Sequence, residues 1–238
     1  RVASRRGLSR TSRRTAAVLL VATLTVVLGA ATRERNLLYG DPLALWQDTV
    51  EKVPDNPRAH HGLGVALVRS GRPADAVNAY RRATALQPSY AEAHYNLGRA
   101  LARIGDHEEA IAAYRRTLAL DPDDFKAHNN LGNALLRLGR AAEAEPHFRE
   151  VVRLDPDSPF GHNGLGLALA AQGELDEALA AYERALRRRP RYTQAMLNAG
   201  LVLEAKGEVA AAAEYYHRVL RLEPGQAAAR SRLAALGE

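Results

Sequence analysis

The sequence has no cysteine and few aromatic residues, and each scarcity excludes a class of structure. Without cysteine, the 238-residue chain has no disulfide framework, no cysteine-ligated zinc site and no thiol nucleophile. Aromatic residues make up 5% of the chain, although 47% of it is hydrophobic. A core built largely from alanine and leucine favours closely packed helices.

The chain also lacks a net basic charge outside its N-terminal residues 1–14. Residues 1–14 hold six arginines and no acid, which leaves 27 basic and 27 acidic residues in the rest of the chain. The net charge of +6 therefore describes a basic tail. A tail of this kind is poor evidence for a nucleic-acid-binding domain, so we expect no nucleic-acid partner.

One uncharged hydrophobic run follows this tail, at residues 15–32. A helix over this run spans roughly 27 Å, enough to cross the hydrocarbon core of a bilayer. The arginines before it predict a cytoplasmic N-terminus and an extracytoplasmic location for everything after Thr32. Three interpretations fit: a cleaved signal peptide, an uncleaved single anchor, and the last span of a longer polytopic protein. Because the run is long for a signal peptide, we expect a transmembrane helix over 15–32 and a linker over 33–40.

The rest of the chain repeats itself with a period of 34 residues. If the first recurring glycine is called position 8, five repeats follow one another without insertion: 57–90, 91–124, 125–158, 159–192 and 193–226. Position 7 is leucine in four repeats, positions 8 and 15 are always glycine, and position 20 is always alanine. Position 24 is tyrosine or phenylalanine, and position 32 is always proline.

These positions predict two helices in each repeat. Apolar residues at helical spacing precede the glycine at position 15, which ends the first helix, and the proline at position 32 ends the second. The glycine at 8 and the alanine at 20 have almost no side chain, so the two helices can approach closely beside the aromatic residue. Because one such pair cannot bury its apolar face alone, successive pairs must stack into a solenoid.

This spacing and these residues resemble the tetratricopeptide repeat (TPR) family. The resemblance covers residues 57–226 and implies an all-α solenoid, a right-handed superhelix of stacked helix-turn-helix hairpins, here preceded by one transmembrane helix. Residues 41–56 match the second half of a repeat, with Trp46 at position 24, and we expect them to cap the N-terminal end. Residues 227–238 match the first half and are expected to form a C-terminal cap or truncated sixth repeat.

The join between anchor and repeats has a resemblance of its own. Residues 32–36, Tyr39, Trp46 and the sequence Pro-Asp-Asn-Pro at 54–57 are similar to the tail of multi-span bacterial membrane proteins. In those proteins, TPRs follow a glycosyltransferase-like membrane domain. The resemblance implies an alternative in which this chain is the C-terminal tail of a polytopic, O-mannosyltransferase-like glycosyltransferase and presents its protein substrate.

No catalytic constellation appears in the sequence, so we expect no enzyme activity within this chain, no cofactor and no metal. Position 4 is histidine in four successive repeats: His60, His94, His128 and His162. Neighbouring equivalent helices lie roughly 8–10 Å apart, so successive histidines cannot easily share one ion. We interpret them as packing residues. The glycine-rich stretch 161–166 follows no strand and therefore lacks the context of a nucleotide-binding loop.

The densest basic run after the tail lies at the end of a predicted second helix and consists of Arg184, Arg187, Arg188, Arg189 and Arg191. Arginines at a helix C-terminus complement the helix dipole, so the run fits a solvated helix end. The alternative is a contact for an acidic partner or a lipid headgroup.

The TPR resemblance implies a concave groove lined by positions 2, 5, 9, 12 and 13. Carried onto this sequence, the ligand-binding residues are Tyr95, Arg99, Arg103, Lys126, Asn129, Asn133, Arg137 and Asn163. Residues at the two ends flank this set: Arg58, His61 and Arg69 at one end, Phe160, Gln194 and Lys206 at the other. Amides and cations of this kind suit an extended peptide or its carboxylates.

Together these features predict a membrane-anchored bacterial TPR scaffold that binds a protein or peptide partner. We expect the inner (cytoplasmic) membrane as its location, with the TPR domain on the periplasmic or extracytoplasmic side. Self-association through the ends of the solenoid is a further interaction that this architecture allows.

Overall fold

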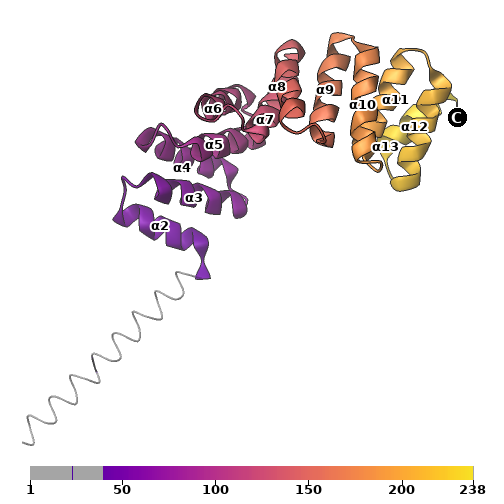
Figure 1. The fold of residues 1–238 in the computed structure, drawn as a ribbon. Helices are drawn as coiled ribbons and strands as arrows, with labels where there is room; N and C mark the ends of the chain where they lie inside the picture. Colours follow the sequence, from indigo (N-terminus) through magenta and orange to yellow (C-terminus); the bar gives the residue numbers. More distant parts are fainter. Residues whose placement is uncertain (1–22, 24–39, 238) are drawn as a thin grey trace, which may run out of the picture.

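The structure is a computed structural model that describes Thr23 and residues 40–237. Residues 40–237 form twelve helices and no strand, and consecutive helices pack in a curved row (Figure 1). The helices are α2 (Pro42–Lys52), α3 (Pro57–Arg69), α4 (Pro73–Leu86), α5 (Ala91–Ile104), α6 (His107–Leu120), α7 (Phe125–Arg137), α8 (Ala141–Leu154), α9 (Pro159–Gln172), α10 (Leu175–Arg188), α11 (Thr193–Ala205), α12 (Val209–Leu222) and α13 (Ala227–Leu236). The expected all-α TPR solenoid is confirmed for this part of the chain.

Most of the expected N-terminal organisation lies outside the described residues. This applies to the basic tail 1–14, the transmembrane helix expected over 15–32 and the linker over 33–40, of which the structure describes only Thr23 and Gly40. In the part that is described, no helix has both the length and the apolarity needed to cross a membrane.

Each repeat holds a first and a second helix that meet at the glycine of position 15. This glycine has a φ between 72° and 89° in all five repeats, a conformation that residues with a Cβ rarely adopt. At Gly105 and Gly173 the backbone N–H bonds back to carbonyls of the helix that it ends. The glycine therefore stops the first helix as predicted and turns the chain toward the second.

The aromatic ring at position 24 packs directly against the backbone of the first helix. These rings are at most 2% exposed: Tyr80, Tyr114, Phe148, Tyr182 and Tyr216. A Cβ atom added to the position-8 glycine of each repeat would lie 2.5–2.7 Å from a ring carbon. Only glycine leaves room for the ring. The sequence predicted a close approach of the two helices, and the structure shows that the ring itself occupies the contact.

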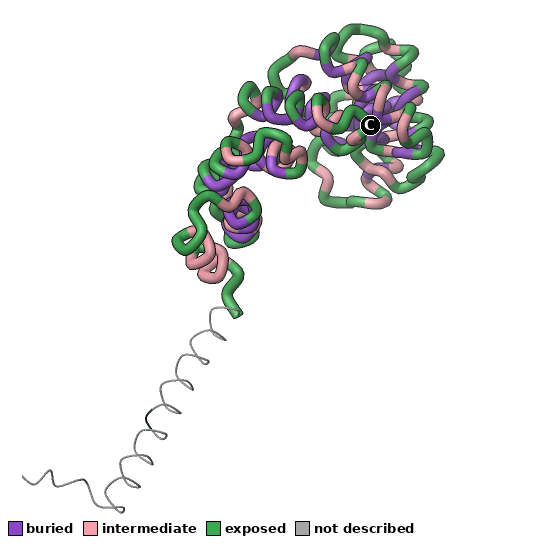
Figure 2. Tube along the Cα trace, turned by 60° about the vertical axis from the view of Figure 1, so that its left-hand side comes forward, coloured by how far each residue is buried: buried purple, intermediate pink, exposed green. Residues whose placement is uncertain are grey.

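The first helices line the inner face of the curve. Each contacts the first helix of the next repeat as well as the second helices on either side, whereas the second helices make no comparably extensive contacts with one another in residues 40–237. Figure 2 shows the buried residues along the sides where helices face each other, from α3 onward. The inner face is therefore built from the positions that the TPR resemblance assigns to the groove.

A half-repeat lies at each end of the array. Asp41 caps α2 by accepting a hydrogen bond from the backbone N–H of Leu43 at 2.9 Å. The ring of Trp46 lies against Gly62 of α3, so closely that a side chain at Gly62 would collide with it. At the other end, α13 buries Leu233 against the last repeat.

The four position-4 histidines link successive repeats. Each Nε2 lies 2.7–3.1 Å from the carbonyl oxygen of the proline that follows the preceding second helix, as His60 does at Pro54 and His162 at Pro156. This hydrogen bond satisfies a carbonyl in the turn between repeats. The interpretation as packing residues is confirmed. Among the described residues, no group of three or more histidine and carboxylate side chains could hold a metal ion.

Replacing Gly98 with alanine tests the contact between ring and backbone. The added methyl would lie 2.6 Å from Cε1 of Tyr114, so we expect a loss of about 1–3 kcal/mol in the free energy of unfolding. Gly225→Ala is the matched control, because nothing lies within 4 Å of its added Cβ. Urea unfolding followed by circular dichroism would check both variants. Equal midpoints for the two would contradict the role given to the ring.

Candidate binding groove

Seven of the eight predicted groove residues line hollows on the inner face. The smallest hollow, of about 60 Å³, is lined by Arg99 and Arg103. The second, of about 150 Å³, is lined by Tyr95, Lys126 and Asn129. The largest of the three, of about 550 Å³, is lined by Asn133, Arg137 and Gln194. The first helices α5, α7 and α9 supply most of these walls, together with Gln194 at the start of α11. The structure therefore places these seven residues in three hollows formed mainly by α5, α7 and α9.

Asn163 differs from the other seven. It is 7% exposed, and its Oδ1 accepts a hydrogen bond from Nδ2 of Asn198 at 3.0 Å. The side chain thus joins α9 to α11 and lines none of the three hollows. Its role as a ligand contact stays a prediction, and its carbonyl oxygen already has a partner within the protein.

The predicted flanking residues also divide by environment. His61 is 9% exposed, and burial lowers its pKa, with the charge of a nearby glutamate opposing the shift. Lys206 forms ion pairs with Asp176 and Glu208, both at 2.7 Å. Phe160 is 53% exposed beside the hollow that Asn129 lines. Of these three, Phe160 alone offers most of its side chain to a ligand.

The groove cations have no carboxylate partner. In the described part of the chain, no ion pair forms at Arg99, Arg103, Lys126 or Arg137. Arg99 lies 5.7 Å from the centre of the Tyr95 ring. Burial raises the pKa of the Tyr95 hydroxyl, and the Arg99 charge opposes this shift. Unpaired positive charge therefore runs along the inner face.

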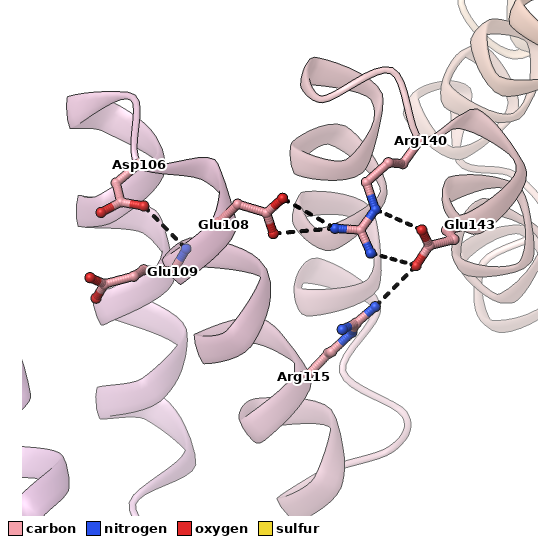
Figure 3. Close-up of polar contacts among 6 residues, drawn as sticks. All are labelled: Asp106, Glu108, Glu109, Arg115, Arg140 and Glu143. Carbon is pink, nitrogen blue, oxygen red and sulfur yellow. Dashed lines mark hydrogen bonds and ion pairs between the residues drawn. The ribbon is translucent and has the colours of Figure 1, made fainter.

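In the layer of second helices several cations are paired, although others, such as Arg116 and Arg221, form no ion pair among the described residues. Arg140, which precedes α8, contacts Glu108 of α6 at 3.2 Å and Glu143 of α8 at 2.6 Å, and Arg115 of α6 reaches the same Glu143 at 3.2 Å (Figure 3). Such exposed pairs contribute little to stability. They neutralise part of the charge of that layer. The unpaired cations of the groove differ in lying beside the hollows of the inner face, where they suit an anionic ligand.

The arginine run at the end of α10 is split between different neighbours. Arg188 pairs with Asp157 at 2.6 Å, across the turn to the preceding repeat. Arg189 lies 5.6 Å from the ring centre of Phe160 and 5.1 Å from that of Tyr192. Part of the run thus supports an aromatic pair near the groove, a role that neither sequence interpretation included.

Sequence reasoning missed Phe125 as a groove residue. It is 44% exposed at the first position of α7 and lines the same hollow as Asn129. The sequence does mark this residue, because the first position is a large aromatic side chain only here. The other four repeats begin with proline, alanine or threonine.

Solved structures with the same architecture include several TPR proteins. MamA of Desulfovibrio magneticus RS-1 is 25% identical, with a TM-score of 0.68 over 72% of this chain and 97% of that one. PilF of Pseudomonas aeruginosa is 23% identical, with a TM-score of 0.68 over 90% and 96%. YrrB, described as a TPR protein with an unusual peptide-binding site, is 22% identical, with a TM-score of 0.67 over 78% and 96%. No curated protein matches the sequence.

A family model confirms the assignment that the repeats suggested. The model described as tetratricopeptide repeat matches four overlapping or successive stretches: 39–77, 61–125, 104–159 and 163–234. These stretches include most of the chain and nearly all of its described helices. The chain therefore belongs to the tetratricopeptide repeat family.

Proposed function

We propose that this chain is a membrane-anchored TPR scaffold that holds a peptide or protein partner in its concave groove on the extracytoplasmic side of the inner membrane. The observation that carries the proposal is the row of unpaired cations, from Arg99 to Arg137, beside the half-buried amide of Asn129 and the exposed amide of Asn133. Cations form charge-assisted hydrogen bonds with carboxylates, and amides pair with a peptide backbone. YrrB, which shares this fold, is described as having a peptide-binding site.

The membrane part of the proposal is supported by sequence. The uncharged run 15–32 has the length of a bilayer span, and six arginines precede it. An anchor of this kind would hold the groove close to the membrane surface, where it could collect partners that are secreted or embedded there.

The same groove would serve the alternative in which the chain is the tail of a polytopic membrane glycosyltransferase. What favours that alternative is the junction sequence, from Thr32 through Trp46 to Pro57. In that case the bound peptide is the protein substrate, and the groove delivers it to a membrane domain elsewhere in the protein.

A double variant, Arg99→Ala/Asn133→Ala, tests the groove. With the full chain in detergent as bait for a membrane extract, we expect the retained partner to fall about tenfold or more, because charge-assisted and amide hydrogen bonds are lost. The matched control is Arg116→Ala/Arg221→Ala, which removes two exposed arginines of the second helices. Quantitative mass spectrometry would compare the three baits. If the groove variant still retains the partner, or if the control variant loses as much partner as the groove variant, binding does not occur in the groove.

Single cysteines test the topology, because the natural chain has none. In spheroplasts treated with a membrane-impermeant maleimide, we expect Gly225→Cys to be labelled before lysis and Ser4→Cys only afterwards. Gly225 suits this use because the space around its added side chain is open. Labelling of Ser4→Cys alone in intact spheroplasts, or recovery of the chain in the soluble fraction, would contradict the proposed anchor and side.

A further inference from the structure

Hydrogen bonds between asparagines and their neighbours cross the groove from repeat to repeat. In each, the Nδ2 of an asparagine at position 6 lies 2.9–3.1 Å from a polar atom of the position-5 side chain in the preceding repeat. We call each such bond a rung. Three rungs are present: Asn96 to His61, Asn130 to Tyr95, and Asn198 to Asn163.

One rung is missing in the middle of this series. Asn129 is the position-5 residue here, and the position-6 residue of the next repeat is Gly164, which has no side chain to donate. Within the described part of the chain, the Asn129 amide has no hydrogen-bond partner. Both of its polar groups, one carbonyl oxygen and one NH₂, are therefore available to a ligand.

The identity of the packing ring explains the missing rung. Within the five full repeats, position 6 is asparagine where the preceding ring is tyrosine, as with Asn130 after Tyr114; in the C-terminal half-repeat it is Arg232 after Tyr216. It is glycine where that ring is tryptophan or phenylalanine, as with Gly62 after Trp46 and Gly164 after Phe148. At both glycines an added Cβ would collide with the ring. The core residue Phe148 thus leaves Asn129 unpaired on the surface.

The unpaired amide opens into an apolar hollow, which we call the anchor pocket. The pocket measures about 150 Å³, and its walls include Tyr95, Phe125, Lys126, Asn129, Val151 and Phe160. A cavity of about 150 Å³ elsewhere is known to hold benzene, so the space suits one phenyl or branched aliphatic group.

Two exposed phenylalanines stand at the mouth of the anchor pocket. Phe125 is 44% and Phe160 is 53% exposed, although aromatic side chains usually bury most of their surface. Phe160 is held in place by an edge contact with Tyr192, at 5.6 Å between ring centres, and by the Arg189 guanidinium. A wall that is already fixed loses little conformational entropy when a ligand binds.

Three cations lie in or near the anchor pocket, together with the carboxylate of Asp124, whose charge acts on Tyr95 and whose Oδ1 accepts a hydrogen bond from the backbone N–H of Lys126. Lys126 is part of the wall, Arg99 lies beside the Tyr95 ring, and Arg137 lines the next hollow along the groove. None of the three is paired with a carboxylate of the described residues. Ligand residues on either side of the pocket should therefore be acidic.

We propose that the anchor pocket receives one aromatic or branched aliphatic side chain of an extended acidic peptide. Asn129 pairs with the peptide backbone at that residue, and Arg99, Lys126 and Arg137 pair with flanking aspartates or glutamates. This inference rests on the proposed function and specifies the ligand of its groove. The pocket and the cations around it would therefore select peptides in which one apolar residue lies between acidic residues.

Selection from a random peptide library tests the chemical class directly. With the full chain in detergent immobilised, we expect enriched peptides to share one aromatic or branched aliphatic residue flanked by acidic residues. Replacing that residue with alanine should raise the Kd about tenfold or more, since one buried apolar side chain is lost. Enrichment of basic peptides, or of peptides that tolerate alanine there, would overturn the proposal.

Two pocket variants separate this inference from the wider groove function. Phe148→Tyr/Gly164→Asn transplants the residue pair found at complete rungs and should engage Asn129 internally. Phe160→Ala removes one wall. Its control is Val209→Ala, at a hydrophobic residue that is also exposed, by 44% against 53% for Phe160. We expect both pocket variants to weaken binding of the selected peptide about tenfold or more, with the control unchanged. Circular dichroism would check folding, and Phe160→Ala keeps the test valid if the double variant misfolds.

The remaining outcomes are distinguishable. If both pocket variants bind normally while Arg99→Ala/Asn133→Ala does not, the groove binds peptides without the anchor pocket, and the inference is wrong. If no peptide is enriched on the natural chain, the inference and the proposed groove function both fail. Sedimentation velocity tests whether the anchor pocket is instead occupied by a second copy of this chain. An oligomer that dissociates in the Phe160→Ala variant would overturn the peptide proposal.

Discussion

The contact between an aromatic ring and a glycine backbone sets the spacing of every helix pair in this protein. Because the ring at position 24 lies against the glycine at position 8, the two helices of each repeat adopt nearly the same distance five times over. Trp46 makes the corresponding contact with Gly62 at the N-terminal end. Stacking of equal units then gives a regular curve, whose inner face belongs to the first helices.

The same contact links the core to the groove. Where the ring is Tyr80, Tyr114 or Tyr182, the next repeat has an asparagine that closes a rung across the inner face; where it is Phe148, the next repeat has Gly164 and the rung is absent. A single hydroxyl in the core thus coincides with a change in the amides of the two neighbouring first helices, α7 and α9. Function in this account arises from an interruption of the repeat, in the middle of an otherwise regular series.

The helices and their register could be predicted from sequence because they depend on residue types within one repeat. Gly105 needs a positive φ and Pro88 cannot continue a helix, whatever lies around them. The rungs could not be predicted, because they join residues 35 apart and depend on how one repeat is rotated against the next. Asn129 and Asn163 occupy equivalent positions in the sequence pattern, yet Asn163 is buried in a rung and Asn129 faces an open pocket. The exposure of Phe125 and the missing ion pairs of the groove are tertiary properties of the same kind.

The central claim is that Asn129 is the open position in a row of otherwise engaged side chains. Asparagine side-chain amide resonances, measured by heteronuclear NMR during a titration with a selected acidic peptide, test it most directly. Asn130 lines the same pocket, so the comparison is made with Asn96 and Asn198, whose rungs lie outside it. The account predicts that the Asn129 NH₂ signals shift, while those of Asn96 and Asn198 move little. Equal shifts in all three, or shifts in Asn96 and Asn198 alone, would contradict it.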